Sequence, residues 1–207
     1  MTDITNGGMD DPVLQAALTY IEKGWPTFPL HRRILGEDGK SRCSCGKPNC
    51  RAKGKEPLTL HGNKDATTDE ATIRAYLRKY PRCNLGIATG EASGLLVLDI
   101  DGPEGRESLS GLEKGKGTLP ATLTSATGRT DGGEHSFFRY PKGTGIGCPR
   151  KVAPGIHVMG TGGYVVAPPS IHESGRAYAW IDESIEVAEL PQAWVDLLVK
   201  AQKSRLG

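Results

Sequence analysis

The sequence lacks any long apolar run and carries almost no net charge. No stretch approaches the roughly 20 apolar residues that a helix needs to cross a bilayer, and Met1 to Asp11 has no hydrophobic segment of the kind found in a secretory signal. We therefore expect an intracellular protein with no membrane partner. Because 26 basic and 24 acidic side chains leave a net charge of +2, any attraction for nucleic acid has to come from local clustering.

Cysteine is scarce as well. Three of the five cysteines fall within eight residues, and the other two, Cys83 and Cys148, stand alone. This is a poor match to the disulfide framework of a small secreted domain. The chain has 207 residues, which is long enough to bury a core without such bonds, and we expect residues 1–207 to form a single domain.

Two helices are predicted before residue 84. The first follows Asp11, which can cap it, and ends near Gly24. The second is predicted to begin near Thr67, where Thr67 and Glu70 have capping-box spacing, and to stop at Pro81. Between them, residues 25–30 are expected to form a short strand.

From residue 84 onward, short apolar runs separated by glycine and proline are typical of strands. The predicted strands are Leu85 to Thr89, Leu95 to Ile100, Leu123 to Ala126, His135 to Tyr140, Ile156 to Met159, Tyr164 to Ala167 and Ala177 to Ile181. A final helix is predicted over residues 191–203. The fold class is therefore mixed α/β (α+β), with a sheet core over residues 84–181.

Two aspartates end the most apolar of these strands. Asp99 and Asp101 are two residues apart, so their side chains point to the same face, with bases roughly 6 to 7 Å apart. Carboxylates at this spacing can bind a pair of Mg²⁺ or Mn²⁺ ions, which suits metal-dependent phosphoryl transfer. A simple turn at Asp-Gly-Pro is the alternative, although two carboxylates on one face repel each other without a cation.

A phosphatase of the haloacid dehalogenase type also has an apolar strand followed by Asp-x-Asp-Gly. That family needs a further acidic pair downstream. The aspartates after Asp101 are Asp131, Asp182 and Asp196. Since none of them is next to a second aspartate, this alternative is disfavoured.

A glycine-rich segment leads from Ser125 to His135. Three glycines in six residues let backbone N–H groups approach an anion closely, and Arg129 and His135 supply donors for phosphate oxygens. We interpret the segment as a triphosphate cradle; a purely structural turn is the alternative. The residues predicted to bind nucleotide are Ser125, Gly128, Arg129, Gly133, His135 and Lys55.

Residues 31–62 combine cysteines with positive charge. Cys43, Cys45 and Cys50 are spaced for a structural zinc site, which needs a fourth ligand from His31, which we favour, or His61. Eight basic side chains against two acidic ones give a local net charge of +6 between residues 32 and 55. Bound zinc would order this segment so that it follows a template phosphate backbone; a solvated loop of unligated thiols is the alternative.

Taken together, these pieces resemble the N-terminal domain of bifunctional DNA primase/polymerases, in the archaeo-eukaryotic primase superfamily. The similarity spans most of the chain. It is carried by Gly24-Trp25-Pro26, Phe28-Pro29-Leu30, Gly54-Lys55, Pro57, Ala66-Thr67-Thr68, Asn84 to Gly90, Leu98 to Gly105, Ser125 to His135 and Gly162 to His172.

The resemblance implies a primase-type catalytic domain with an RNA-recognition-like mixed sheet, flanking helices and a small zinc-bearing loop. It implies an active centre made of an acidic pair, here Asp99 and Asp101, and a histidine that meets the triphosphate, here His135. A third carboxylate is usual where this chain has His157. An imidazole cannot neutralise a metal ion as a carboxylate does, although it can ligate Mn²⁺, so a role for His157 as a catalytic ligand competes with a plain structural one.

A second departure concerns the Gly-Lys-x-Pro segment, where related sequences often carry histidine and this chain has Glu56.

The resemblance implies a DNA-directed nucleotidyltransferase that makes or extends primers on single-stranded DNA from dNTP or NTP. Mg²⁺ or Mn²⁺ would be catalytic and Zn²⁺ structural. The chain would be the N-terminal part of a longer replication protein, with a helicase domain or protein as a further partner. The alternative is a catalytically weak or inactive nucleotide- and DNA-binding module of a replication or defence protein.

Overall fold

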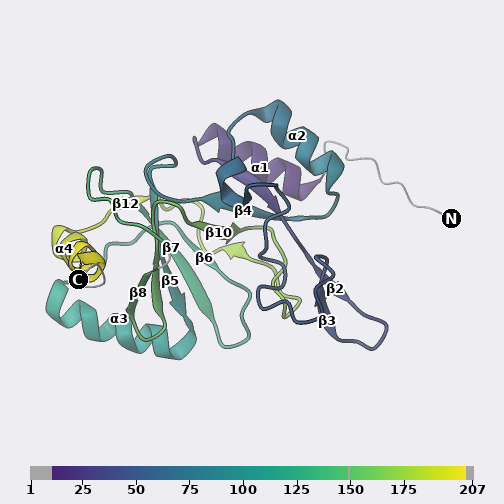
Figure 1. Ribbon diagram of the computed structural model, residues 1–207. Helices are drawn as coiled ribbons and strands as arrows, with labels where there is room; N and C mark the ends of the chain where they lie inside the picture. The colour runs from purple at the N-terminus through teal and green to yellow at the C-terminus, as the bar shows by residue number, and fades with distance from the viewer. Residues whose placement is uncertain (1–10, 149, 204–207) are drawn as a thin grey trace.

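A computed structural model of the chain describes residues 11–148 and 150–203 (Figure 1). The polar N-terminal stretch discussed above lies outside these residues, except for Asp11. Within the described ranges, no helix is both long and apolar enough to cross a membrane.

The larger sheet has seven strands, in the order β11-β6-β7-β5-β9-β8, with β12 beside β7. All its pairings are antiparallel except that of β12 with β7. The strands are β5 (Leu95–Asp101), β6 (Thr124–Ala126), β7 (Gly133–Arg139), β8 (Arg150–Ala153), β9 (Ile156–Met159), β11 (Ala179–Trp180) and β12 (Ala188–Glu189).

Central strand β5 is apolar toward both faces of this sheet. Leu96 and Leu98 belong to a core that includes Trp194 of α4 (Gln192–Lys203), with Leu109 of α3 (Gly102–Lys116) packed against it. Val97 points the other way, into the second core. Because side chains alternate along a strand, Asp99 shares the face of Val97, away from α3 and α4.

A smaller sheet covers that opposite face. It has the order β1-β4-β10, from β1 (Thr27–Leu30), β4 (Asn84–Ala88) and β10 (Tyr164–Ala167). Helices α1 (Pro12–Glu22) and α2 (Glu70–Lys79) pack on it, as the top of Figure 1 shows. Ile87 and Val165 of this sheet share one core with Val97 and Phe137 of the larger sheet, so the two sheets face each other.

Residues 31–62, called the arm below, project from the end of β1. The arm contains a hairpin of β2 (Arg33–Leu35) and β3 (Ser41–Cys43), followed by turns up to the 3₁₀ helix η1 (Gly62–Asp65). The side-chain amide of Asn84 donates to the Gly54 carbonyl at 2.8 Å. This hydrogen bond anchors the C-terminal part of the arm to the start of β4.

Most of the predicted elements are confirmed. Helix α1 begins after Asp11, whose side chain accepts the Val13 N–H. Each of the seven strands predicted after residue 84 is present, with bounds that differ by at most two residues. The mixed α+β class is thus correct.

The predicted start of α2 is wrong. Its N-cap is Asp69, whose carboxylate accepts the N–H of Thr72 at 2.8 Å, and not Thr67. The backbone of Thr67 instead bridges to Thr27 at the start of β1, which holds it in an extended conformation. Tertiary pairing overrides the local capping-box signal.

Helix α3 was not predicted at all. Its 15 residues include four glycines, which lower intrinsic helix propensity. The helix is stabilised by packing, because its apolar residues Leu109 and Leu112 lie against the core under the larger sheet. The arm hairpin and strand β8 were also missed.

Candidate functional site

Four of the predicted site residues lie side by side across four neighbouring strands. Asp99 on β5 is directly opposite His135 on β7 and His157 on β9, and His135 is directly opposite Ser125 on β6. Directly opposed residues of antiparallel strands point to the same face, with Cβ atoms about 4.5 to 5.5 Å apart. We call Ser125, His135, Asp99 and His157 the cross-strand row; it faces the smaller sheet.

Asp101 lies two residues further along β5, on the same face as Asp99. One donor atom each from Asp99, Asp101 and His157 can be chosen so that all lie within 4.8 Å of one another, and Nδ1 of His157 is 3.7 Å from Oδ2 of Asp101. All three side chains are partly exposed, so the group is open to solvent. Oxygen donors with one imidazole nitrogen suit Mn²⁺ and, less well, Mg²⁺. The predicted convergence of the two carboxylates is confirmed.

His135 is buried, with its side chain only 8 % exposed, as is Ser125 beside it. Its Nε2 is 3.6 Å from Oδ1 of Asp99. Burial lowers the pKa of His135 below its usual value, and the nearby Asp99 carboxylate opposes this only in part. The ring is therefore neutral near pH 7 and can donate from one nitrogen.

Three buried polar atoms of the β6–β7 hairpin have no hydrogen-bond partner among the described residues. They are Oγ of Ser125, Oγ1 of Thr127 and Nδ1 of His135. Buried polar atoms are nearly always paired, so this cluster is a place where a polar ligand or water would be stabilised. Thr127 was not predicted as a site residue, although it lies within the glycine-rich segment.

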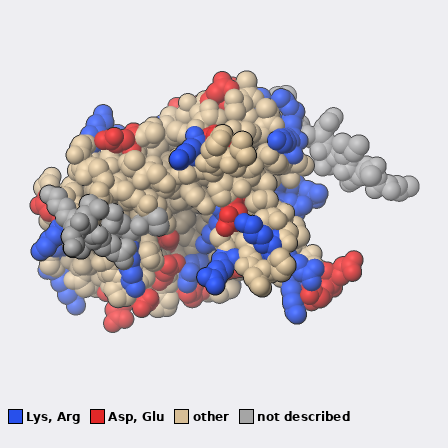
Figure 2. All heavy atoms as spheres, viewed as in Figure 1, with Lys and Arg blue, Asp and Glu red and all other residues tan. Residues whose placement is uncertain are grey.

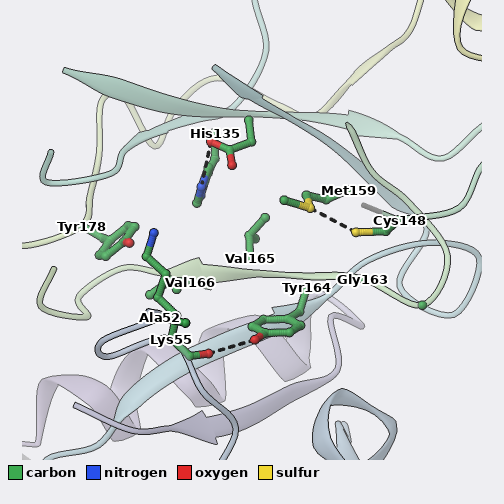
Figure 3. A pocket seen from close by; sticks show the side chains of 12 residues that line it. Ala52, Lys55, His135, Cys148, Met159, Gly163, Tyr164, Val165, Val166 and Tyr178 are labelled. Atoms are coloured by element: carbon green, nitrogen blue, oxygen red, sulfur yellow. Dashed lines mark hydrogen bonds and ion pairs between the residues drawn. The ribbon is translucent and has the colours of Figure 1, made fainter. Parts of the chain in front are cut away.

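A cavity of about 290 Å³ opens between the two sheets beside this row. Figure 3 shows His135 on one wall and Lys55 and Tyr164 on the opposite side, with the Tyr178 ring 6.0 Å from that of His135. The lining residues are Ala52, Lys55, Asp99, His135, Cys148, Met159, Gly162, Gly163, Tyr164, Val165, Val166 and Tyr178. Sequence reasoning missed the two tyrosines, Cys148 and Met159, which carry no motif and reach the cavity only through the pairing of the strands.

Lys55 reaches the cavity because the end of the arm is anchored. The Tyr164 hydroxyl donates to the Lys55 carbonyl at 2.9 Å, and Figure 3 shows the Lys55 side chain extending into the cavity toward His135. Lys55 also affects the pKa of His135. Burial lowers this pKa most, Asp99 raises it, and Lys55 lowers it by a smaller amount. Lys55 thus lines the same cavity as Asp99 and His135, while its predicted contact with phosphate stays a prediction.

The glycine-rich segment forms the turn between β6 and β7. A Cβ on Gly128, whose φ is +72°, would lie 2.8 Å from the Arg176 carbonyl oxygen, and one on Gly133 would lie 2.6 Å from Oγ1 of Thr127. Both positions therefore require glycine for close packing of the turn. Their predicted contact with nucleotide is a separate matter that the packing does not test.

Arg129 in this turn contacts one member of the acidic pair, Asp101. Its Nη1 lies 2.9 Å from Oδ1 of Asp101, and its Nη2 lies 2.8 Å from Oδ2 of Asp131. The Asp131 hydrogen bond raises the pKa of Arg129, so the guanidinium stays charged. The predicted contact of Arg129 with phosphate stays a prediction; the structure adds that Arg129 is an ion-pair partner of a predicted metal ligand.

The three arm cysteines converge, with sulfur atoms that all lie within 4.8 Å of one another. Neither candidate histidine joins this group. Nδ1 of His31 is 2.8 Å from the Ser44 hydroxyl, and His61 is exposed and pairs with Asp65 at 3.0 Å. Three thiolates suit zinc, and the fourth ligand, His31 in our prediction, stays untested.

The space-filling view shows basic side chains gathered on and around the arm, beside a hollow in the surface (Figure 2). Acidic side chains lie on the other side of this hollow, toward α3. The arm therefore carries a local excess of positive charge, +6 between residues 32 and 55, although the whole chain is nearly neutral.

Comparison with known proteins gives one result for this chain. Residues 17–193 match the family model described as bifunctional DNA primase/polymerase, N-terminal. A search among curated proteins found no match. The matched region contains the whole cross-strand row, the cavity and the arm.

Proposed function

Because the chain belongs to the family of bifunctional DNA primase/polymerase N-terminal domains, we propose that it catalyses metal-dependent, template-directed nucleotidyl transfer. The substrates would be dNTP or NTP and a primer on single-stranded DNA. One observation carries the proposal: Asp99, Asp101 and His157 form a compact donor group beside His135 and the cavity.

Asp99 and Asp101, with His157, are the residues that would hold Mg²⁺ or Mn²⁺. Ions bound there would neutralise the triphosphate and lower the pKa of the attacking 3′-hydroxyl. His135, neutral and buried, donates a hydrogen bond to a phosphate oxygen. Lys55 adds a positive charge from the opposite wall of the cavity, so the phosphates lie between fixed charges.

The hydroxyls of Ser125 and Thr127 fit the same role. Both are buried and lack a partner among the described residues, so a polar ligand beside His135 would satisfy them. The backbone of the Thr127–Gly133 turn would complete the cradle around the phosphates.

The arm would bind the template. Its eight basic side chains give it a local excess of positive charge, and Figure 2 shows basic side chains gathered beside a hollow in the surface. Contacts between such side chains and phosphate are independent of base sequence. Zinc on the three thiols would keep the arm in one conformation. A helicase domain or protein that supplies the single strand is part of the same proposal.

Template-directed incorporation of labelled nucleotide, measured separately with Mn²⁺ and Mg²⁺, tests the proposal. We expect Asp99→Ala/Asp101→Ala to lower incorporation by at least about a thousandfold, because the metal ions carry most of the charge stabilisation. Asp196→Ala is the matched control, since Asp196 is an exposed carboxylate on α4. Full activity in the double variant would contradict the proposal.

A second candidate is a binding module without catalysis, which His157 favours. Because an imidazole carries no negative charge, the donor group has two carboxylates where the family usually has three. Absence of incorporation with either metal, together with retained binding of nucleotide and DNA, would support this candidate over the enzyme.

A further inference from the structure

Arg129 makes two ion pairs of unequal geometry. Toward Asp131 it is bidentate, with Nε 2.9 Å from Oδ1 and Nη2 2.8 Å from Oδ2. Toward Asp101 it makes a single contact, between Nη1 and Oδ1 at 2.9 Å. Bidentate pairs are the stronger and more directional kind, so Asp131 is the firmer of the two anchors.

Asp131 has no other assigned role. It does not belong to the donor group of Asp99, Asp101 and His157. Arg106 of α3 donates to its backbone carbonyl at 3.3 Å, which ties the turn to the start of that helix. The Arg129 hydrogen bond lowers the pKa of Asp131, so this carboxylate stays ionised as a partner for the guanidinium.

Asp101, in contrast, has two uses that conflict. Its carboxylate accepts Arg129 and also belongs to the group that would bind a divalent cation. Two cations on one carboxylate repel each other. Arg129 occupies Oδ1 of Asp101, while Oδ2 faces His157. A divalent cation at Asp101 is therefore opposed by the guanidinium, and movement of Arg129 toward the expected phosphates would relieve this repulsion and offer them the donor Nη1.

We propose that Arg129 is a built-in counter-cation of Asp101 which transfers to the triphosphate, and that Asp131 is the positioning residue that holds it within reach. This inference rests on the proposed function, because it needs the metal and the triphosphate at one site. It assigns to Asp131 a role that acts only through Arg129.

The first test is Mn²⁺ binding without nucleotide, measured from the paramagnetic resonance signal of the free ion. Arg129→Gln removes the competing charge, and we expect it to tighten Mn²⁺ binding about two- to fivefold, the range for a partly exposed ion pair. The matched control is Arg139→Gln, which removes the same charge from exposed Arg139 at the far end of β7. Equal Mn²⁺ affinity in wild type and Arg129→Gln would overturn the proposal.

The second test is binding of a non-hydrolysable nucleoside triphosphate with Mn²⁺. Arg129→Gln and Asp131→Asn should each weaken it, and adding Asp131→Asn to Arg129→Gln should change nothing further, because Asp131 acts through Arg129. Asp131→Glu should restore part of the affinity. A full additional loss in the double variant would show a merely structural role for Asp131 and overturn the proposal.

These outcomes separate this inference from the function on which it rests. If Mn²⁺ binds wild type and is lost in Asp99→Ala/Asp101→Ala, while Arg129→Gln has no effect, the metal site stands and the counter-cation role fails. If wild type binds no Mn²⁺, both fail together.

Discussion

Asp99 sits in the central strand of a seven-stranded sheet, whereas Cys43 ends a hairpin strand of three residues. The cross-strand row is held in register by neighbours on both sides and by buried cores on both faces. The arm pairs only three residues on each of its strands. Outside the hairpin, the side chains of Arg33 and Ser41 both donate hydrogen bonds to the Glu173 carbonyl.

The difference teaches how each site is organised. In the row, the fold alone brings carboxylates and imidazoles together, so the residues proposed to bind metal are already in place. In the arm, no residue belongs to the hydrophobic core clusters of the described residues, while the three thiols lie within 4.8 Å of one another. Bound zinc would then contribute to folding of the arm, while metal at the row would contribute only to chemistry.

Gly105→Ala should give the largest effect on stability, because it attacks the packing that holds the row. A Cβ there would lie 2.5 Å from the Gly155 carbonyl oxygen, which itself accepts the Asp101 N–H at 2.7 Å. The added methyl group forces α3 away from β9, and we expect a loss of about 1 to 3 kcal/mol in the free energy of unfolding. Urea denaturation measures it.

Gly111→Ala is the matched control in the same helix. Gly111 is exposed, and a Cβ there would meet nothing within 4 Å. Alanine should therefore stabilise the protein by about 0.5 to 1 kcal/mol through helix propensity. If Gly105→Ala behaved like this control, tight packing would not be what positions the row.

Local patterns in the sequence predicted much of the fold. Short apolar runs separated by glycine and proline predicted the strands, and the spacing of Asp99 and Asp101 predicted that both face one side. Helix α3 could not be predicted, because its glycines hide a helix that only tertiary packing stabilises.

The site was predictable only in part, for a related reason. The row depends on which strands are neighbours, and pairing of β5 with β7 and β9 is long-range information. The place of Lys55 depends on the Tyr164 hydroxyl, far away in sequence. The ion pair of Arg129 with Asp101 likewise appears only once the turn is folded.

The arm offers the contrasting test. Replacing Cys43, Cys45 and Cys50 by serine should abolish zinc binding, measured by metal analysis, and weaken single-stranded DNA binding about tenfold, because the basic side chains lose a fixed arrangement. Mn²⁺ binding at the row should not change. Cys83→Ala, outside the arm, is the control; loss of Mn²⁺ binding in the triple variant would show that the two regions are not independent.

His157→Asp tests the role of the row in metal binding, and we expect it to change activity by a smaller factor. A third carboxylate favours Mg²⁺, which prefers oxygen ligands, over Mn²⁺, which tolerates nitrogen. We expect incorporation with Mg²⁺ to rise about three- to tenfold while incorporation with Mn²⁺ changes less. The ratio of the two rates is the measurement, and an unchanged ratio would mean that residue 157 does not ligate the catalytic ion.

The smallest effect concerns His172, which lies between the two regions. Burial and the positive charge of Lys55 lower the pKa of His172, while Glu173 raises it. Nδ1 of His172 accepts the Ser174 N–H at 3.1 Å, and it must be unprotonated to do so. A histidine whose pKa is lower when folded contributes stability that is present above its ordinary pKa and lost as the pH falls below it. Urea denaturation between about pH 8 and about pH 5 should therefore show wild type losing more stability than His172→Gln, with His135 contributing equally to both. If wild type and His172→Gln lost equal stability over this pH range, protonation of His172 would cost the folded protein nothing, and the prediction would be wrong.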